Sequence, residues 1–256
     1  MSKAASSRCP RVLYLGDVQG ASARYLVGVL SWLGYPCTHL DMHQPPPAAL
    51  HKGKRPFDVI VLSDYPYERL GRESDARVAQ LVHDEGVGLV MLGGWSSFTG
   101  LNGGYRGSQV AAALPVRMAD EDDRRNVPSG LVAWPSAGHT LVDGLSFRRP
   151  PVIMGYNAVL ARSTSTVVLS AWEMRFRGRG KTPVSDLGAA RPLLVIGQHG
   201  AGHTAAFTTD VAPHWCGGLV DWGRGRIRAG DAEVGEVYVE FIRRLLTFAA
   251  FGESAL

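Results

Sequence analysis

The stretch Gly88-Leu-Val-Met-Leu-Gly-Gly-Trp-Ser-Ser-Phe98 joins an apolar run directly to two glycines. Residues 88–92 have the length and composition of a buried β-strand. Two glycines after a strand can turn backbone N–H groups toward one point and form an anion or oxyanion nest, but a tight turn that binds nothing explains them equally well. This strand end is the first candidate for a ligand-binding position.

Strands and helices alternate on the N-terminal side of this stretch. The sequence predicts strands at residues 11–15, 38–40 and 57–62, a helix from about residue 21 to 33, and a second helix capped by Ser74. Short connections between these elements predict a parallel sheet with helices on both faces.

The C-terminal half is less regular. Residues 150–169 predict two strands around Gly155-Tyr156-Asn157, and residues 192–208 predict a hairpin about a glycine-rich turn. A charged, exposed run is expected at residues 120–125. Apolar residues at three- and four-residue steps between residues 234 and 246 predict a last helix. The sheet should therefore change from parallel to mixed in this half.

Composition favours a cytoplasmic protein without a membrane span. The 256 residues are 45% hydrophobic, enough for the core of one large domain or at most two small ones. We expect a single domain over residues 1–256, in which residues 1–10 form a flexible lead-in. The three cysteines are far apart in the sequence, which argues against a disulfide framework or a zinc ribbon. No cofactor and no bound metal are expected.

The formal net charge is +4, and arginines occur in clusters. Such clusters could attract nucleic acid or anionic ligands. Because no nucleic-acid-binding motif accompanies them, solvated loops are the simpler interpretation, and nucleic acid is not an expected partner. The clusters lie at Arg148-Arg149, Arg175–Lys181, Arg224–Arg228 and Arg243-Arg244.

Polar residues follow several of the predicted strands. Ligands collect at the carboxyl ends of parallel strands in open α/β sheets. Aspartates at such ends more commonly cap turns, and that alternative stays open. The candidate ligand-binding residues for a small molecule are Asp17, Asp64, Gly93, Gly94, Trp95 and Asn157.

Short motifs along most of the chain make it similar to the class I glutamine amidotransferase-like superfamily, and in particular to a branch of mostly uncharacterised amidotransferase-like proteins. The resemblance implies an α/β fold, a flavodoxin-like three-layer sandwich whose central sheet is mostly parallel, with mixed strands in the C-terminal half. The motifs are the stretch 88–98, Gly103-Gly-Tyr105, Pro128-x-Gly130, His139-x-Leu-Val-x-Gly144-Leu145, and Gly200–Asp210 with Pro213-His-Trp215.

Active amidotransferases of this superfamily carry a Cys–His–Glu triad, and the chain departs from it twice. The resemblance places the Cys on a strand-to-helix elbow, but residues 93–96 contain none. It places His and Glu after a late strand, but that strand ends in Thr209-Asp210 with no His-x-Glu following. A thiolate needs a neighbouring base, so glutamine hydrolysis by the usual route is not expected. The inferred function is that of a non-catalytic or small-ligand-binding oligomer.

An enzyme with a rearranged site is the alternative hypothesis. Ser96, His214 and Asp210 could serve as nucleophile, base and orienting group of a hydrolase acting on an amide, an ester or a sugar-derived molecule. Against it, Ser96 could simply cap a following helix and Asp210 a turn. Trp95, Trp215 and Trp222 could stack on a ligand or form a subunit interface, and the second role predicts a homo-oligomer.

Overall fold

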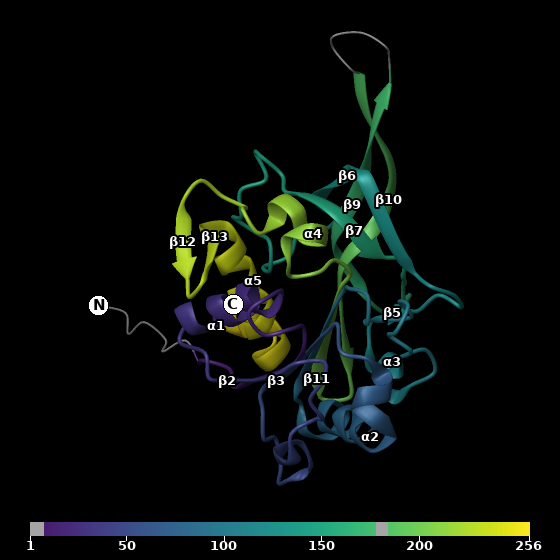
Figure 1. Ribbon diagram of the computed structural model, residues 1–256, viewed down its shortest axis with the longest axis vertical. Helices are drawn as coiled ribbons and strands as arrows, with labels where there is room; N and C mark the ends of the chain where they lie inside the picture. The colour runs from purple at the N-terminus through teal and green to yellow at the C-terminus, as the bar shows by residue number, and fades with distance from the viewer. Residues whose placement is uncertain (1–7, 178–183) are drawn as a thin grey trace.

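The computed structural model describes residues 8–177 and 184–256. Its centre is a nine-stranded sheet with the order β2-β1-β3-β4-β11-β10-β9-β6-β7 (Figure 1). The strands are β1 (Val12–Gly16), β2 (Cys37–Leu40), β3 (Val59–Ser63), β4 (Gly88–Leu92), β6 (Arg124–Pro135), β7 (Val152–Asn157), β9 (Thr166–Arg177), β10 (Val184–His199) and β11 (Gly202–Phe207).

The sheet has a parallel half and an antiparallel half. Strands β2, β1, β3, β4 and β11 pair in parallel, whereas β10, β9, β6 and β7 add to this half by antiparallel pairing. With β11 in the fifth position, the parallel half has the flavodoxin-like order 2-1-3-4-5. The predicted fold class is confirmed, including the change of strand direction in the C-terminal half.

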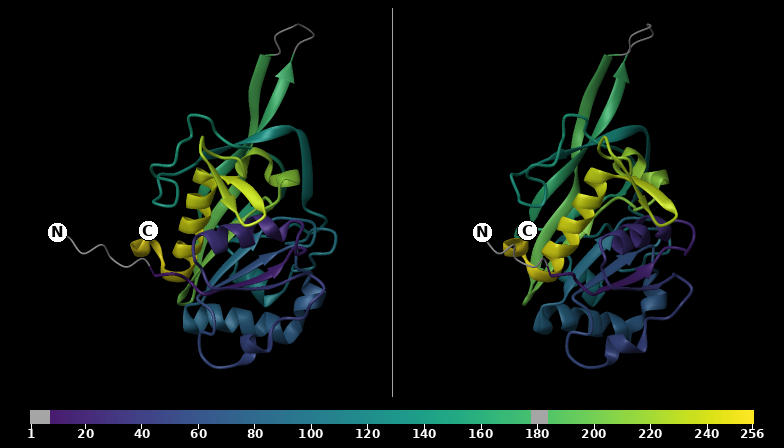
Figure 2. Two further views of the ribbon diagram at one scale, coloured as in Figure 1. Left: turned by 60° about the vertical axis from the view of Figure 1, so that its left-hand side comes forward. Right: turned by 90° about the vertical axis from the view of Figure 1, so that its left-hand side faces the viewer.

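Helices cover both faces of the parallel half (Figure 2). Helices α1 (Ala23–Trp32) and α5 (Glu236–Phe251) lie on one face, and α2 (Tyr67–Glu85) and α3 (Gln109–Ala113) on the other. Residues along β1 alternate between the faces: Tyr14 joins the core under α1 and α5, and Leu13 joins the core over α2. Apolar residues on both faces make β1, β3 and β4 continuous hydrophobic runs, which is why the sequence revealed them.

Short elements complete the fold. They are the pair β5 (Val116–Arg117) with β8 (Leu160–Ala161), the hairpin β12 (Arg226–Ala229) with β13 (Ala232–Gly235), helix α4 (Pro213–Cys216) and the 3₁₀ turns at Ala48–His51, Gly217–Leu219 and Glu253–Ala255. No helix of the described part of the chain is both long and apolar enough to cross a membrane.

Three local predictions were wrong. Helix α2 starts at Tyr67 rather than at Ser74, and Gly71 interrupts it with φ at 73°. Residues 155–157 lie inside β7 instead of between two strands. The run 120–125 is not uniformly exposed, because Asp123 is fully buried. Residues 1–7 of the expected lead-in, and residues 178–181 of one basic cluster, lie outside the described residues.

Candidate functional site

The ends of β1 and β3 place two aspartates side by side. Gly16 and Ser63 are register partners, so Asp17 and Asp64 follow at the same edge of the sheet. Both adopt left-handed backbone conformations, with φ at 51° and 49°. Non-glycine residues rarely adopt this conformation, and such outliers concentrate at functional sites. In the flavodoxin-like order, the gap between the first and third strands is the switch point at which ligands bind.

The carboxylate of Asp64 binds the turn that follows β4. Its Oδ1 accepts a hydrogen bond from the backbone N–H of Ser96 at 2.6 Å. Its own N–H donates to the hydroxyl of Ser97 at 3.0 Å. Burial raises the pKa of Asp64 to about 6, although hydrogen bonds from the N–H groups of Ser96 and Trp95 oppose the shift.

The two glycines of this turn, which with Trp95 and Ser96 form the elbow (residues 93–96), also donate to the protein itself. The N–H of Gly93 lies 2.8 Å from the carbonyl of Phe207 and 2.9 Å from that of Thr209. The N–H of Gly94 donates to Oδ1 of Asn157 at 2.8 Å. The backbone donors that the sequence suggested for an anion nest are therefore bound by Asp64, Asn157 and β11.

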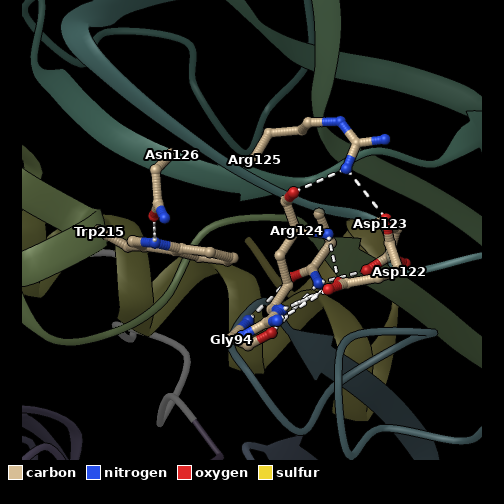
Figure 3. Close-up of polar contacts among 8 residues, drawn as sticks. Gly94, Asp122, Asp123, Arg124, Arg125, Asn126 and Trp215 are labelled. Atoms are coloured by element: carbon tan, nitrogen blue, oxygen red, sulfur yellow. Dashed lines mark hydrogen bonds and ion pairs between the residues drawn. The ribbon is translucent and has the colours of Figure 1, made fainter.

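A second buried carboxylate fixes Asn157, which is itself fully buried. The Asn157 amide donates to Asp123 at 2.7 Å and to the carbonyl of Gly94 at 3.1 Å. Asp123 also accepts from the N–H of Thr99 at 3.0 Å. Figure 3 shows Arg124 beside Gly94, with its guanidinium group bound to Asp122 at 2.7 Å. No sequence pattern pointed to Asp123, because it stands in the charged run 120–125 that was expected to be exposed.

No helix follows the elbow directly. After β4 the chain runs through successive turns, and the next helix is the five-residue α3 from Gln109. A strand-to-helix elbow would have aimed a helix N-terminus at a nucleophile or an oxyanion. Ser96 therefore does not cap a helix, and its position lacks the helix N-terminus that the resemblance implied.

Asp210 follows β11 and is near enough to Asp17 and Asp64 for their charges to affect its pKa. It is fully buried, and its Oδ1 accepts from the N–H of Ala212 at 3.2 Å. Burial raises its pKa well above the usual range, and the charges of Asp17 and Asp64 raise it further. Its Oδ2 lies 3.2 Å from Nδ1 of His214, whose side chain is 51% exposed and whose pKa burial lowers. The half-exposed His214 thus adjoins the acidic site (Asp17, Asp64 and Asp210) through Asp210.

Hydroxyl groups surround the acidic site on the α5 face of the sheet. The Tyr14 hydroxyl donates to Asp17. Burial, followed by the charge of Asp64, raises the pKa of Asp17 to about 7. Within the described residues the buried Tyr238 hydroxyl makes no hydrogen bond, and the polar group beside Oδ2 of Asp210 is the His214 imidazole at 3.2 Å. The sequence pattern assigned Tyr14 and Tyr238 to the core and could not show that their hydroxyls reach the site.

The structure brings Asp210 to His214 but does not connect Ser96 to them. Within residues 8–177 and 184–256, no hydrogen bond joins Ser96 to His214 or Asp210. The same residues include no group of three or more His, Cys, Asp and Glu side chains placed to hold a metal ion.

The three candidate tryptophans are separated. Trp95 is 46% exposed, and the Arg124 guanidinium stacks over its ring at 4.4 Å. Trp215 is buried and donates to Asn126 at 2.7 Å (Figure 3). Trp222 is buried and donates to the carbonyl of Ser146 at 3.0 Å. Of the three, only Trp95 is exposed, and it precedes Ser96 in the turn that Asp64 binds.

The cysteines lie away from the elbow. Cys9 precedes β1 and Cys37 begins β2, so both lie at the amino ends of these strands, whereas the elbow follows the carboxyl end of β4. Cys216 is fully buried, and burial raises the pKa of its thiol well above the usual range. A neutral thiol is a poor nucleophile, and none of the three is positioned as the superfamily's catalytic cysteine.

Comparisons with known proteins identify the family and the fold. Residues 20–226 match the model of a family described as "Putative glutamine amidotransferase". No curated protein matches the chain.

Solved structures show the same fold. The "Cytoplasmic Protein STM3548" from Salmonella typhimurium is 27% identical, with a TM-score of 0.73 over 94% of this chain and 99% of that one. The "Cytoplasmic Protein STM1381" from Salmonella typhimurium LT2 is 24% identical, with a TM-score of 0.71 over 94% and 99%. A "Putative thua-like protein" from Parabacteroides merdae shares the fold at 12% identity, with a TM-score of 0.56 over 96% and 91%. The chain belongs to the class I glutamine amidotransferase-like family whose model spans its residues 20–226.

Proposed function

We propose that this protein binds a small molecule at the acidic site and does not hydrolyse glutamine through a thiolate. The elbow lacks a thiol and a following helix, and its N–H groups already bind Asp64 and Asn157. An oxyanion that formed there would have to displace a carboxylate of the protein.

The buried polar atoms around the acidic site carry the binding proposal. A buried polar atom without a hydrogen bond costs about 1–3 kcal/mol, and native proteins leave few of them. Here the buried Tyr238 hydroxyl makes no hydrogen bond within the described residues, and Oδ2 of Asp210 has the half-exposed His214 imidazole beside it at 3.2 Å. Burial, with the charges of Asp210 and Asp17, raises the pKa of Tyr238. A ligand that supplies N–H or O–H donors would satisfy both oxygens, and a small amine or a polyol has this chemistry. Asp64 and Trp95, which are only partly buried, would contact its outer end.

A ligand panel tests this function. Thermal unfolding is followed with small amines and polyols for the wild type, Asp64→Asn and the control Asp143→Asn, whose exposed side chain lies elsewhere. The proposal expects at least one compound to raise the melting temperature of the wild type and the control but not of Asp64→Asn. If no compound does so, or if the Asp64 variant responds fully, binding at this site is contradicted.

A hydrolase remains the second candidate because of the Asp210–His214 pair. An imidazole held by a buried carboxyl group is the arrangement of a general base. Because no hydrogen bond links Ser96 to this pair, such an enzyme would activate water rather than Ser96. Hydrolysis of p-nitrophenyl acetate that is lost in His214→Ala and kept in Ser96→Ala would support it. No hydrolysis above that of His214→Ala would exclude this candidate for activated esters.

We further propose that the protein is a cytoplasmic homo-oligomer. Both Salmonella relatives are named cytoplasmic proteins. The tryptophans first considered for an interface are not suited to it, because Trp215 and Trp222 are buried within the chain. Trp134 and Leu187, which are 47% and 56% exposed, share an apolar face of the antiparallel half. Light scattering after size-exclusion chromatography should give a multiple of 27.6 kDa, and a monomer at micromolar concentration would contradict this.

A further inference from the structure

Two loops that are distant in sequence converge on a basic pocket beside the start of α5. The pocket has a volume of about 370 Å³, and its lining includes Arg148, Arg149 and Arg224. The first two arginines belong to the connection between β6 and β7, and Arg224 precedes β12. The pocket shares no lining residue with the acidic site.

The guanidinium groups of these three arginines bind no other group in the described part of the chain. Across residues 8–177 and 184–256, no ion pair or side-chain hydrogen bond engages Arg148, Arg149 or Arg224. Two arginines further along α5 are paired, because Glu240 binds both Arg243 and Arg244. The pocket therefore brings three guanidinium groups, unpaired within the described residues, to one place.

The single acidic residue in the lining, Glu236, is directed at the loop. Its Oε1 accepts the N–H of Arg224 at 2.9 Å, and its Oε2 is buried against Gly223. Hydrogen bonds from the N–H groups of Arg224 and Gly225 lower the pKa of Glu236, so it stays ionised. Its carboxylate holds the loop that presents Arg224, and it lines the pocket beside the three arginines.

Trp222 ties the two loops together. Its indole N–H donates to the carbonyl of Ser146 at 3.0 Å, and its ring lies 4.9 Å from that of Phe147. Both partners directly precede Arg148 in the chain. The Trp222 contacts hold the backbone of both arginine-bearing loops in place. This lowers the entropic cost of ordering the loops around a ligand.

We propose that this pocket binds a small phosphorylated anion through Arg148, Arg149 and Arg224. Guanidinium groups form bidentate hydrogen bonds with phosphate oxygens, and three of them complement a doubly charged group. A pocket volume of about 370 Å³ suits a phosphate ester or a pyrophosphate. A nucleic-acid backbone would need a longer basic track, and the pairing of Arg243 and Arg244 with Glu240 interrupts one.

Isothermal titration calorimetry with sodium pyrophosphate and with glucose 6-phosphate, at low ionic strength, tests the pocket. Variants are Arg224→Ala, Arg224→Lys and the double change Arg148→Ala/Arg149→Ala. Arg228→Ala is the matched control, because Arg228 is exposed on the same hairpin but does not line the pocket. We expect at least one probe to bind, with affinity reduced at least tenfold in Arg224→Ala and in the double variant, less in Arg224→Lys, and unchanged in the control.

Three outcomes would overturn the proposal. One is the absence of heat from both probes with the wild type. Another is equal weakening by Arg228→Ala, which would indicate diffuse charge attraction. The third is anisotropy of a labelled 20-nucleotide single strand showing Arg224-dependent binding while neither small probe binds. Circular dichroism of each variant checks that the fold is kept, and the N–H of residue 224 still binds Glu236 in all of them.

Discussion

The carboxylate of Asp64 accepts the N–H of Ser96 at 2.6 Å, so the turn after β4 is held by an anion that the protein supplies itself. An anion nest in this position would otherwise be free for a substrate oxyanion. The same carboxylate also faces the acidic site. Asp64 therefore links the closed elbow to the proposed ligand position.

Removing the Asp64 carboxylate should destabilise the elbow. Asp64→Ala leaves the N–H of Ser96 without its acceptor and places alanine at a φ of 49°, so we expect a loss of about 2–3 kcal/mol in unfolding free energy. Asp64→Asn keeps an acceptor and tolerates this backbone conformation, and should lose less than about 1 kcal/mol. Urea unfolding measures both, and equal losses would contradict the assigned role.

Gly94 should tolerate no side chain. A Cβ built there would lie 2.2 Å from Oδ1 of Asp64, and its φ is 155°. Gly94→Ala should therefore cost at least about 2 kcal/mol, because both the clash and the strain must be relieved. Gly138→Ala is the control, since no atom lies within 4 Å of its Cβ position. Similar unfolding midpoints for the two variants would show that the elbow is looser than described.

The burial of Asp17 predicts a pH-dependent difference between the wild type and Asp17→Asn. Its pKa rises from 3.8 to about 7 on folding, so the folded state holds more protons in this window. The contribution of Asp17 to the free energy of unfolding is fully present below about pH 4 and is lost as the pH rises toward 7. Asp17→Asn should thus be close to the wild type at pH 4.5 and more stable by roughly 2–4 kcal/mol at pH 8.

Asp58→Asn provides a control of opposite sign for this experiment. Hydrogen bonds from Arg11 lower the pKa of Asp58 despite partial burial, so its contribution is present above pH 4 and lost in acid. This variant should be less stable than the wild type at pH 8. A stability gain for Asp17→Asn that does not change between pH 4.5 and 8 would contradict the assigned protonation.

The side chain of Asn157 should stabilise the fold as well as hold the elbow. It joins Gly94 to Asp123, and all its side-chain bonds are buried. Asn157→Ala would leave the buried N–H of Gly94 and the buried carboxylate of Asp123 without this partner. The expected loss in unfolding free energy is about 2–4 kcal/mol. Asn126→Ala removes one bond to Trp215 near the surface and should cost less. Guanidinium denaturation compares the two, and the reverse order would contradict the network.

The parallel half of the fold was predictable because its signals are local. Strands β1, β3 and β4 are buried on both faces and read as apolar runs, and α5 shows its buried stripe directly. Edge strand β7 was misread because Gly155 and Asn157 suggest a turn, whereas Gly155 is needed where Trp215 packs 2.4 Å from its Cβ position. That contact joins residues that are far apart in the sequence.

The site was predictable only in part, for the same reason. Strand ends identified Asp17, Asp64 and Asp210, since parallel strands bring their carboxyl ends together. The partners that decide their chemistry are Tyr14, Asp123 and Tyr238, which come from a core face, a charged loop and a distant helix. Whether the chain forms one domain stays a prediction.

Ammonia release from glutamine tests the central claim most directly. Purified wild type and Cys216→Ser are incubated with millimolar glutamine, and ammonia is measured by a coupled dehydrogenase assay. The account predicts no release above the buffer background for either protein, because the thiols are buried or remote and the elbow donors bind Asp64 and Asn157. Release by the wild type that is lost in Cys216→Ser would contradict it and would show a working amidotransferase with a rearranged nucleophile.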